Sequence, residues 1–141
     1  MKKVLIFLSL ILLLGCTKKI DKFYLDDKYY GKSEFIKIDS NNIPTGNYII
    51  YTYNSFCAFP IHCETIFKEF MDKNNISFYS MPFEELKKTK FHDKVIYGPS
   101  ILIIKDNELI AYLDAESDDD IPKYQDVDAF TNWITTYIYI K

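Results

Sequence analysis

The stretch of sequence that decides the fold reads Tyr48-Ile49-Ile50-Tyr51-Thr52-Tyr53-Asn54-Ser55-Phe56-Cys57-Ala58-Phe59-Pro60-Ile61-His62-Cys63. Its first six residues are aromatic or β-branched, which predicts a buried strand. Two polar residues then interrupt the pattern. Pro60 suits the first turn of a helix, where no amide hydrogen is needed. We therefore expect a strand, a turn that carries Cys57, and a helix from Pro60 to about Lys73 that contains Cys63.

The beginning of the chain has the pattern of a targeting segment. Lys2 and Lys3 precede an apolar run that ends at Leu14 and is too short for a stable membrane span. The run closes with Leu13-Leu14-Gly15-Cys16, which resembles a bacterial lipobox. This resemblance implies cleavage before Cys16 and a lipid on its sulfur, which would hold the protein at a membrane. The alternative is an ordinary secretory signal in which Cys16 is incidental.

The lipobox interpretation divides the chain into three parts. Residues 1–15 form the signal peptide, residues 16–34 the lipidated cysteine and a tether, and residues 35–141 one domain, which faces the extracytoplasmic side of a cell membrane. The aromatic side chains of the tether could instead pack on the domain or contact the membrane interface. Without Lys2 and Lys3, 15 of the 17 basic residues remain against 20 acidic ones, and the sequence has no arginine. This composition excludes the basic face of a nucleic-acid-binding protein.

The rest of the chain alternates strand and helix patterns. We expect strands at Ile76 to Met81, Ser100 to Lys105 and Leu109 to Leu113, with a short edge strand at Phe35 to Ile38 as a further candidate. A second helix begins at Pro82, and a last helix is capped by Asp126 or Asp128. The apolar faces of the first and last helices comprise Ile66, Phe67, Phe70, Met71, Phe130, Trp133, Ile134, Tyr137 and Ile138.

This element order, with a cysteine pair at the first strand-to-helix turn, resembles the thioredoxin family. A second match is Val95-Ile96-Tyr97-Gly98-Pro99-Ser100-Ile101-Leu102-Ile103-Ile104-Lys105-Asp106-Asn107-Glu108, which looks like the cis-proline strand and hairpin of that family. The resemblance implies an α/β fold with a central mixed four-stranded sheet in the order βαβαββα, flanked by helices. It also implies a cis peptide bond before Pro99, beside the cysteines. The alternative is a trans proline that only begins a strand.

The cysteine spacing departs from that family, which carries Cys-x-x-Cys. Here five residues separate Cys57 from Cys63, and six residues of regular helix advance about 9 Å, too far for a disulfide. The sulfurs can meet only if the segment from Cys57 to Phe59 folds back over the start of the helix. Since Cys16 would carry lipid, an even pair remains in a compartment where disulfides persist. Three interpretations stay open: a redox-active pair, a structural disulfide that staples the loop, and two thiols without a redox role.

The resemblance implies thiol–disulfide exchange with protein thiols or disulfides. Cys57 would be the attacking cysteine and Cys63 the resolving one, Pro99 would shape the substrate groove, and Phe56 and Phe59 would supply apolar contacts. The alternative function is a non-catalytic module that binds a partner protein, with the cysteines as a staple. We predict no cofactor.

Metal binding is a weaker hypothesis. His62 and His92 would suit a soft metal together with the two cysteines, but their spacing matches no metal motif. His92 has the surroundings of a surface residue. The acidic run from Glu116 to Asp120 lacks the spaced pattern of a calcium loop, so we predict a solvated loop. No metal site is therefore expected.

Overall fold

A computed structural model describes residues 21–141. Its elements comprise β1 (Phe35–Lys37), β2 (Tyr48–Tyr53), α2 (Cys63–Asn74), β3 (Phe78–Pro82), α3 (Phe83–Leu86), β4 (Ser100–Lys105), β5 (Glu108–Tyr112), α4 (Ile121–Gln125) and α5 (Val127–Ile134), with short 3-10 helices η2 (Asp27–Tyr29) and η3 (Lys90–Asp93). The predicted signal peptide and the predicted lipidation site, Cys16, lie outside the described residues.

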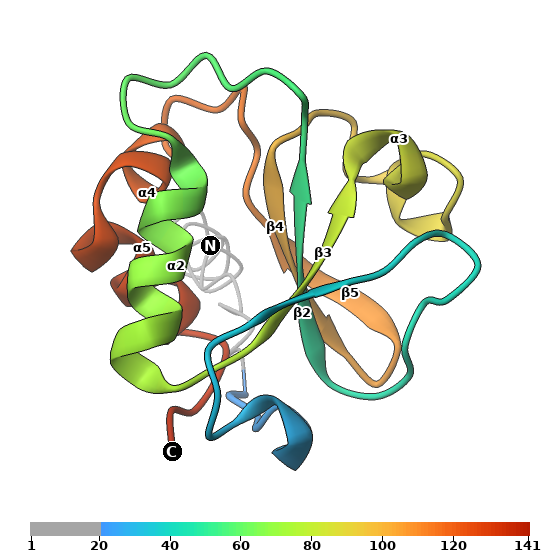
Figure 1. Ribbon diagram of the computed structural model, residues 1–141, viewed down its shortest axis with the longest axis vertical. Helices are drawn as coiled ribbons and strands as arrows, with labels where there is room; N and C mark the ends of the chain where they lie inside the picture. Colours follow the sequence, from blue (N-terminus) through green and yellow to red (C-terminus); the bar gives the residue numbers. More distant parts are fainter. Residues whose placement is uncertain (1–20) are drawn as a thin grey trace, which may run out of the picture.

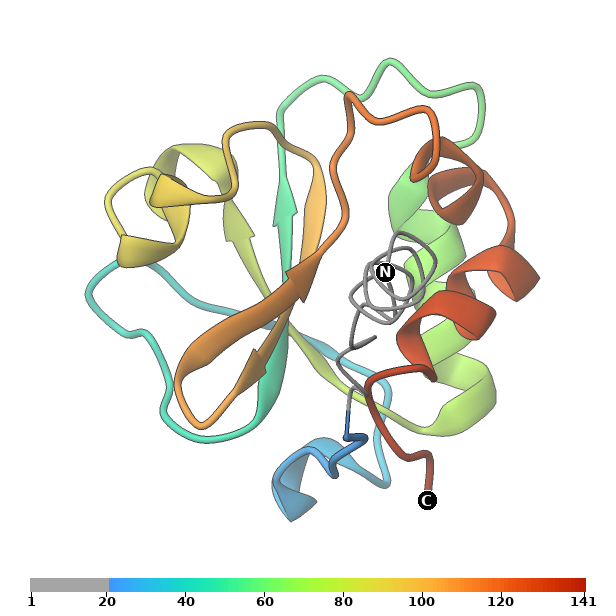
Figure 2. The same ribbon diagram turned by 180° about the vertical axis from the view of Figure 1, so that it is seen from behind.

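The strands form one mixed sheet in the order β1-β3-β2-β4-β5. β3 is parallel to both β1 and β2, whereas β4 is antiparallel to both β2 and β5. Helices α2, α4 and α5 cover one face of the sheet, and α3 lies on the other, as Figures 1 and 2 show from opposite sides. The central strands β2 and β4 are buried along nearly their whole length, which matches their apolar sequences.

The mixed α/β architecture agrees with the expectation, but the predicted order βαβαββα is met only in part. Two short helices, α4 and α5, take the place of the single last helix, and the sheet has five strands rather than four because the candidate edge strand at Phe35 to Ile38 is present. The additional strand, β1, pairs with β3 through three residues only. So short a segment shows no alternation of apolar and polar residues that would separate a strand from a loop.

Residues 21–34 pack against the domain. Phe23, Leu25 and Tyr29 are buried, and Phe23 pairs with Ile138 near the end of the chain. The boundary at residue 35 is therefore corrected for the described part: residues 21–34 belong to the folded unit rather than to a tether. This corresponds to the alternative in which the aromatic side chains of the segment pack on the domain.

The helices differ from the expectation mainly in length. The second expected helix is reduced to the four residues of α3, and η3 follows it. The last helix begins where predicted, since the Asp126 side chain accepts a hydrogen bond from the Ala129 amide at 2.7 Å. The short helix α4 precedes it and was not expected. In the hairpin between β4 and β5, Asp106 and Asn107 have positive φ angles of 51° and 68°, as a type I′ turn requires.

Candidate functional site

The structure brings Cys57 and Cys63 together although six positions separate them. Residues 54–62 form a loop above the end of β2, and Cys63 is the first residue of α2 (Figure 1). The two sulfurs lie 3.8 Å apart, and both cysteines are free thiols. Cys57 is half-buried and Cys63 is fully buried. A small movement of the loop would bring the sulfurs to bonding distance, so the predicted disulfide remains a prediction.

Helix α2 begins three residues later than predicted. Pro60 lies in the loop, and His62 is the N-cap residue of the helix. The amide groups of the helix N-terminus therefore lie beside the buried thiol of Cys63. Burial nevertheless dominates, and it raises the pKa of Cys63 to about 12, although a hydrogen bond with Tyr51 acts in the opposite direction. Cys63 is thus a protonated thiol at neutral pH.

Helix α4 holds the cysteine loop from the side. The Gln125 side chain accepts a hydrogen bond from the Ile61 amide at 3.0 Å and donates one to the Ile61 carbonyl oxygen at 2.9 Å. Phe59 stacks on Tyr124 with 4.9 Å between ring centroids. The Tyr124 hydroxyl in turn donates to the carbonyl oxygen of Pro99 at 2.8 Å. These contacts join the loop, α4 and the beginning of β4 into one unit.

Pro99 lies at the same end of the sheet as the cysteine loop. Its neighbour Ser100 is paired with Thr52 across β2 and β4, and the Asn54 side chain donates to the Gly98 carbonyl oxygen at 2.7 Å. The Gly98–Pro99 peptide bond is cis, as predicted. Pro99 itself is buried, so a partner would meet the residues around it before it meets the proline ring.

The two phenylalanines of the loop have different surroundings. The side chain of Phe56 is 82% exposed and lines a hollow of about 690 Å³ together with residues that include Tyr53, Phe83, Tyr97 and Gly98. Phe59 is half-buried because it stacks on α4. Phe56 is therefore available as an apolar contact, whereas Phe59 serves to pack the loop.

Sequence reasoning missed the residue that contacts the buried sulfur. The hydroxyl oxygen of Tyr51, on β2, lies 3.7 Å from Cys63 Sγ at hydrogen-bonding distance for sulfur. The ring of Tyr51 packs edge-on against Phe67 of α2, with centroids 5.3 Å apart. In the sequence, Tyr51 was one of several strand aromatics, and only the direction of its side chain toward α2 distinguishes it.

The histidines lie apart from each other. His62 is exposed at the beginning of α2, and His92 Nδ1 lies 3.0 Å from the Val95 carbonyl oxygen, beyond α3. Across residues 21–141, no three His, Cys, Asp or Glu side chains gather as ligands for a metal ion. In the acidic loop, Asp120 pairs with Lys123 at 2.5 Å and accepts from the Asp114 amide at 2.9 Å.

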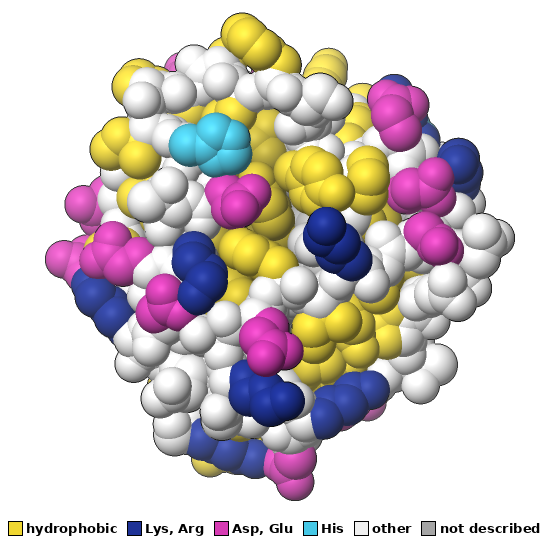
Figure 3. All heavy atoms as spheres, viewed as in Figure 1, with side chains coloured by type: hydrophobic (Ala, Val, Ile, Leu, Met, Phe, Trp, Pro, Cys, Tyr) yellow, Lys and Arg dark blue, Asp and Glu magenta, His cyan; other side chains and the backbone are white. Residues whose placement is uncertain are grey.

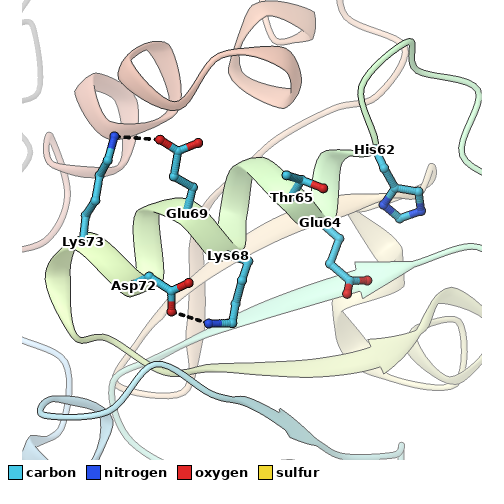
Figure 4. A pocket seen from close by; sticks show the side chains of 7 residues that line it. All are labelled: His62, Glu64, Thr65, Lys68, Glu69, Asp72 and Lys73. Atoms are coloured by element: carbon cyan, nitrogen blue, oxygen red, sulfur yellow. Dashed lines mark hydrogen bonds and ion pairs between the residues drawn. The ribbon is translucent and has the colours of Figure 1, made fainter.

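A second hollow runs along α2, and its lining consists of charged and polar side chains of that helix and His62. Figure 4 shows its side chains, which include the ion pairs Lys68–Asp72 and Lys73–Glu69. Exposed pairs of this kind at i,i+4 spacing support a helix only weakly. Within residues 21–141, no helix combines the length and the apolar character needed to cross a membrane.

Comparisons with known proteins add little. No protein-family model matches the sequence, and no curated protein sequence matches it either. Among solved structures, the chain is similar to thioredoxin f2 of Chlamydomonas reinhardtii, with a TM-score of 0.46 and 10% identity over 72% of this chain and 94% of that one. So low a score carries no argument about fold or function.

Proposed function

We propose that this protein is a thioredoxin-like thiol–disulfide exchange protein that acts on protein substrates at the extracytoplasmic side of a membrane. The observation that carries the proposal is the pair of sulfurs 3.8 Å apart with unequal burial, Cys57 within reach of solvent and Cys63 enclosed. Thiol–disulfide exchange needs one accessible sulfur that reacts with the substrate and a second sulfur that reacts only with the first cysteine. The element order and the position of Pro99 support the same assignment.

The chemistry follows from this division. The Cys57 thiolate attacks one sulfur of a substrate disulfide, and the other substrate sulfur leaves as a thiolate that takes up a proton. Cys63 then loses its proton and attacks Cys57 Sγ, which releases the second substrate sulfur. The substrate disulfide is thereby reduced to two thiols, and the Cys57–Cys63 pair is oxidised to a disulfide. The reverse sequence would oxidise a substrate.

The surface around Cys57 suits an apolar segment of a substrate protein. Phe56 is exposed beside it, and Ile96 and Tyr97 are 58% and 51% exposed in the segment that leads to Pro99. These side chains line the same hollow. Aromatic side chains are enriched at protein interfaces and among the residues that contribute most to binding.

The membrane location rests on the sequence Leu13-Leu14-Gly15-Cys16, and Cys16 is the residue that would carry the lipid. Only four residues separate it from Asp21, the first residue that the structure describes. A lipid anchor at Cys16 would therefore keep the folded unit close to the membrane surface.

The test is to trap the mixed disulfide. Reduced Cys63→Ser and Cys57→Ser variants are each incubated with a disulfide-bonded test protein and separated under non-reducing conditions. The proposal predicts a covalent complex with Cys63→Ser, because Cys57 attacks and nothing resolves it, and no complex with Cys57→Ser. If neither variant forms a complex, and reduction of the wild-type protein costs about 2 kcal/mol as for loss of a short staple, the pair is structural instead.

A further inference from the structure

We propose that Tyr51 is a positioning residue for the second step of exchange: its hydroxyl donates a hydrogen bond to Cys63 Sγ and stabilises the thiolate that attacks Cys57. This inference rests on the proposed function. It concerns only the resolving step, and it assigns no part to Tyr51 in the first attack on the substrate.

The Tyr51 hydroxyl and the two cysteine sulfurs form a chain of contacts. The Tyr51 hydroxyl lies 3.7 Å from Cys63 Sγ, which lies 3.8 Å from Cys57 Sγ. Tyr51 and Cys63 are 1% and 0% exposed, so little water competes with the Tyr51 hydroxyl for the sulfur. The Tyr51 ring is fixed between Phe67 and Phe35, with centroids at 5.3 and 5.4 Å. A donor held in this way needs no reorganisation when the sulfur becomes charged.

Such a donor matters because the site otherwise opposes a thiolate. Burial raises the pKa of Cys63 to about 12, and a thiol must lose its proton before it can attack. Burial also raises the pKa of Tyr51 far above the usual value for tyrosine. The hydroxyl therefore keeps its proton, and it can donate at any pH at which the protein works. Hydrogen bonds to charged groups are stronger than those between neutral groups.

Other titratable groups lie around Tyr51 and Cys63, and the experiment must distinguish their effects on Cys63 from the effect of Tyr51. Cys57 faces this pair from the loop, Tyr124 from α4, and Glu64 from α2. Glu64 also lines a hollow of about 260 Å³ with Phe35, Lys37, Tyr51, Tyr53 and Ser80. Figure 3 shows hydrophobic side chains between α2 and the strands on this side, with acidic and basic side chains beside them. Cys63 does not line this hollow, which brings solvent to the Tyr51 side chain and to Glu64.

The step balances without another reactant. Cys63 gives its proton to water, and its sulfur forms a bond with Cys57 Sγ. The bond between Cys57 and the substrate sulfur breaks, and the departing substrate thiolate takes up a proton. Tyr51 donates a hydrogen bond throughout and neither gains nor loses its own proton.

The test uses a chromogenic aromatic disulfide as substrate for the reduced protein in a single turnover. Attack by Cys57 releases one aromatic thiolate, and resolution by Cys63 releases the second, so the two steps appear as two phases of absorbance. Between pH 7 and 9 we expect Tyr51→Phe to leave the rate of the first phase unchanged and to slow the second phase about tenfold. The curve of second-phase rate against pH then shifts to higher pH by about one unit. Circular dichroism of each variant reports whether it is folded.

Two variants control the experiment. Tyr48→Phe removes a buried hydroxyl from the same strand and should leave both phases unchanged, and Glu64→Gln measures the effect of the nearest carboxylate. Incorporation of 3-fluorotyrosine at position 51 keeps the ring and strengthens the donor, so it should move the second profile to lower pH even if Tyr51→Phe fails to fold. A second phase with the wild-type profile in both Tyr51 variants overturns the inference. Absence of a second phase in the wild-type protein overturns the proposed function and the inference with it.

Discussion

Replacement of Gln125 by alanine should open the cysteine loop without unfolding the domain. The Gln125 side chain makes two hydrogen bonds to the backbone of Ile61, at 3.0 and 2.9 Å, and so joins α4 to the loop above Cys63. Cys63 is 0% exposed, so a reagent reaches its sulfur only when this loop moves away. The rate at which Cys63 is alkylated therefore measures how often the loop opens.

The expected size of the effect follows from the two bonds. Both are partly exposed to water, so each contributes near the lower end of the usual net range, and together they contribute about 1 kcal/mol. Since 1.4 kcal/mol corresponds to a tenfold change, the open population and the alkylation rate of Cys63 should rise about fivefold. The stacking of Phe59 on Tyr124 remains and keeps the effect moderate. Global stability should fall by no more than about 1 kcal/mol.

The assay is alkylation of Cys63 in a Cys57→Ser background, at fixed pH and with iodoacetamide in excess. Asn132→Ala, which removes an exposed amide side chain from α5, is the matched control and should leave the rate unchanged. An alkylation rate within twofold of the parent in Gln125→Ala would refute the role of α4 as a clamp. So would a rise that hydrogen exchange shows to be shared by the amides of β2 and β4, because that pattern indicates global unfolding.

Three further predictions concern the core, the buried thiol and the anchor. Phe67→Ala should lower the free energy of unfolding by about 3–5 kcal/mol, because this fully buried ring contacts Tyr51, Tyr124 and Phe130. In the same denaturant titration, replacement of the exposed Phe56 by alanine should change the free energy of unfolding by less than about 0.5 kcal/mol. Burial raises the pKa of Cys63 in the folded state above the unfolded value of about 8.5, so the stability that the buried thiol contributes below pH 8.5 is lost as the pH rises toward 12. In alkaline denaturation, the free energy of unfolding of the reduced protein should therefore fall by up to about 1.4 kcal/mol per pH unit more than that of Cys63→Ala. An equal dependence of the two free energies on pH would contradict the burial argument. Cys16→Ala should release the protein from membranes or block its maturation, and a variant that fractionates with membranes at its mature size would count against a lipid anchor.

The strands and the position of the site could be predicted from local patterns. β2 and β4 have the predicted bounds because β2 is a run of aromatic and β-branched residues, β4 is a run of aliphatic ones, and both are bordered by polar or turn-forming residues. The apolar face of α2 was predicted for the same reason, and its residues at helical spacing are buried. For the two cysteines, helix geometry gave only a condition: their sulfurs could meet if the segment from Cys57 to Phe59 folded back over the start of the helix.

The features that were missed depend on tertiary contacts. Pro60 can begin a helix, but the loop it belongs to is held by Gln125 and Tyr124, more than sixty positions away in sequence, and α2 begins only at Cys63. The strand at Phe35 to Ile38 could be predicted only as a candidate, because β1 is too short to show a period and is stabilised by pairing with the edge of β3. The contact between Tyr51 and Cys63 requires knowledge of which face of β2 meets α2, which the sequence of a fully buried strand does not reveal.

The reduction potential of the Cys57–Cys63 pair tests the central claim most directly. It is measured by equilibrating the protein with glutathione or dithiothreitol buffers of known ratio and alkylating the thiols that remain. An exchange protein must gain and lose this disulfide readily, so the account predicts a potential above about −300 mV. A value well below about −300 mV would contradict the account, because a disulfide of that stability serves as a structural staple.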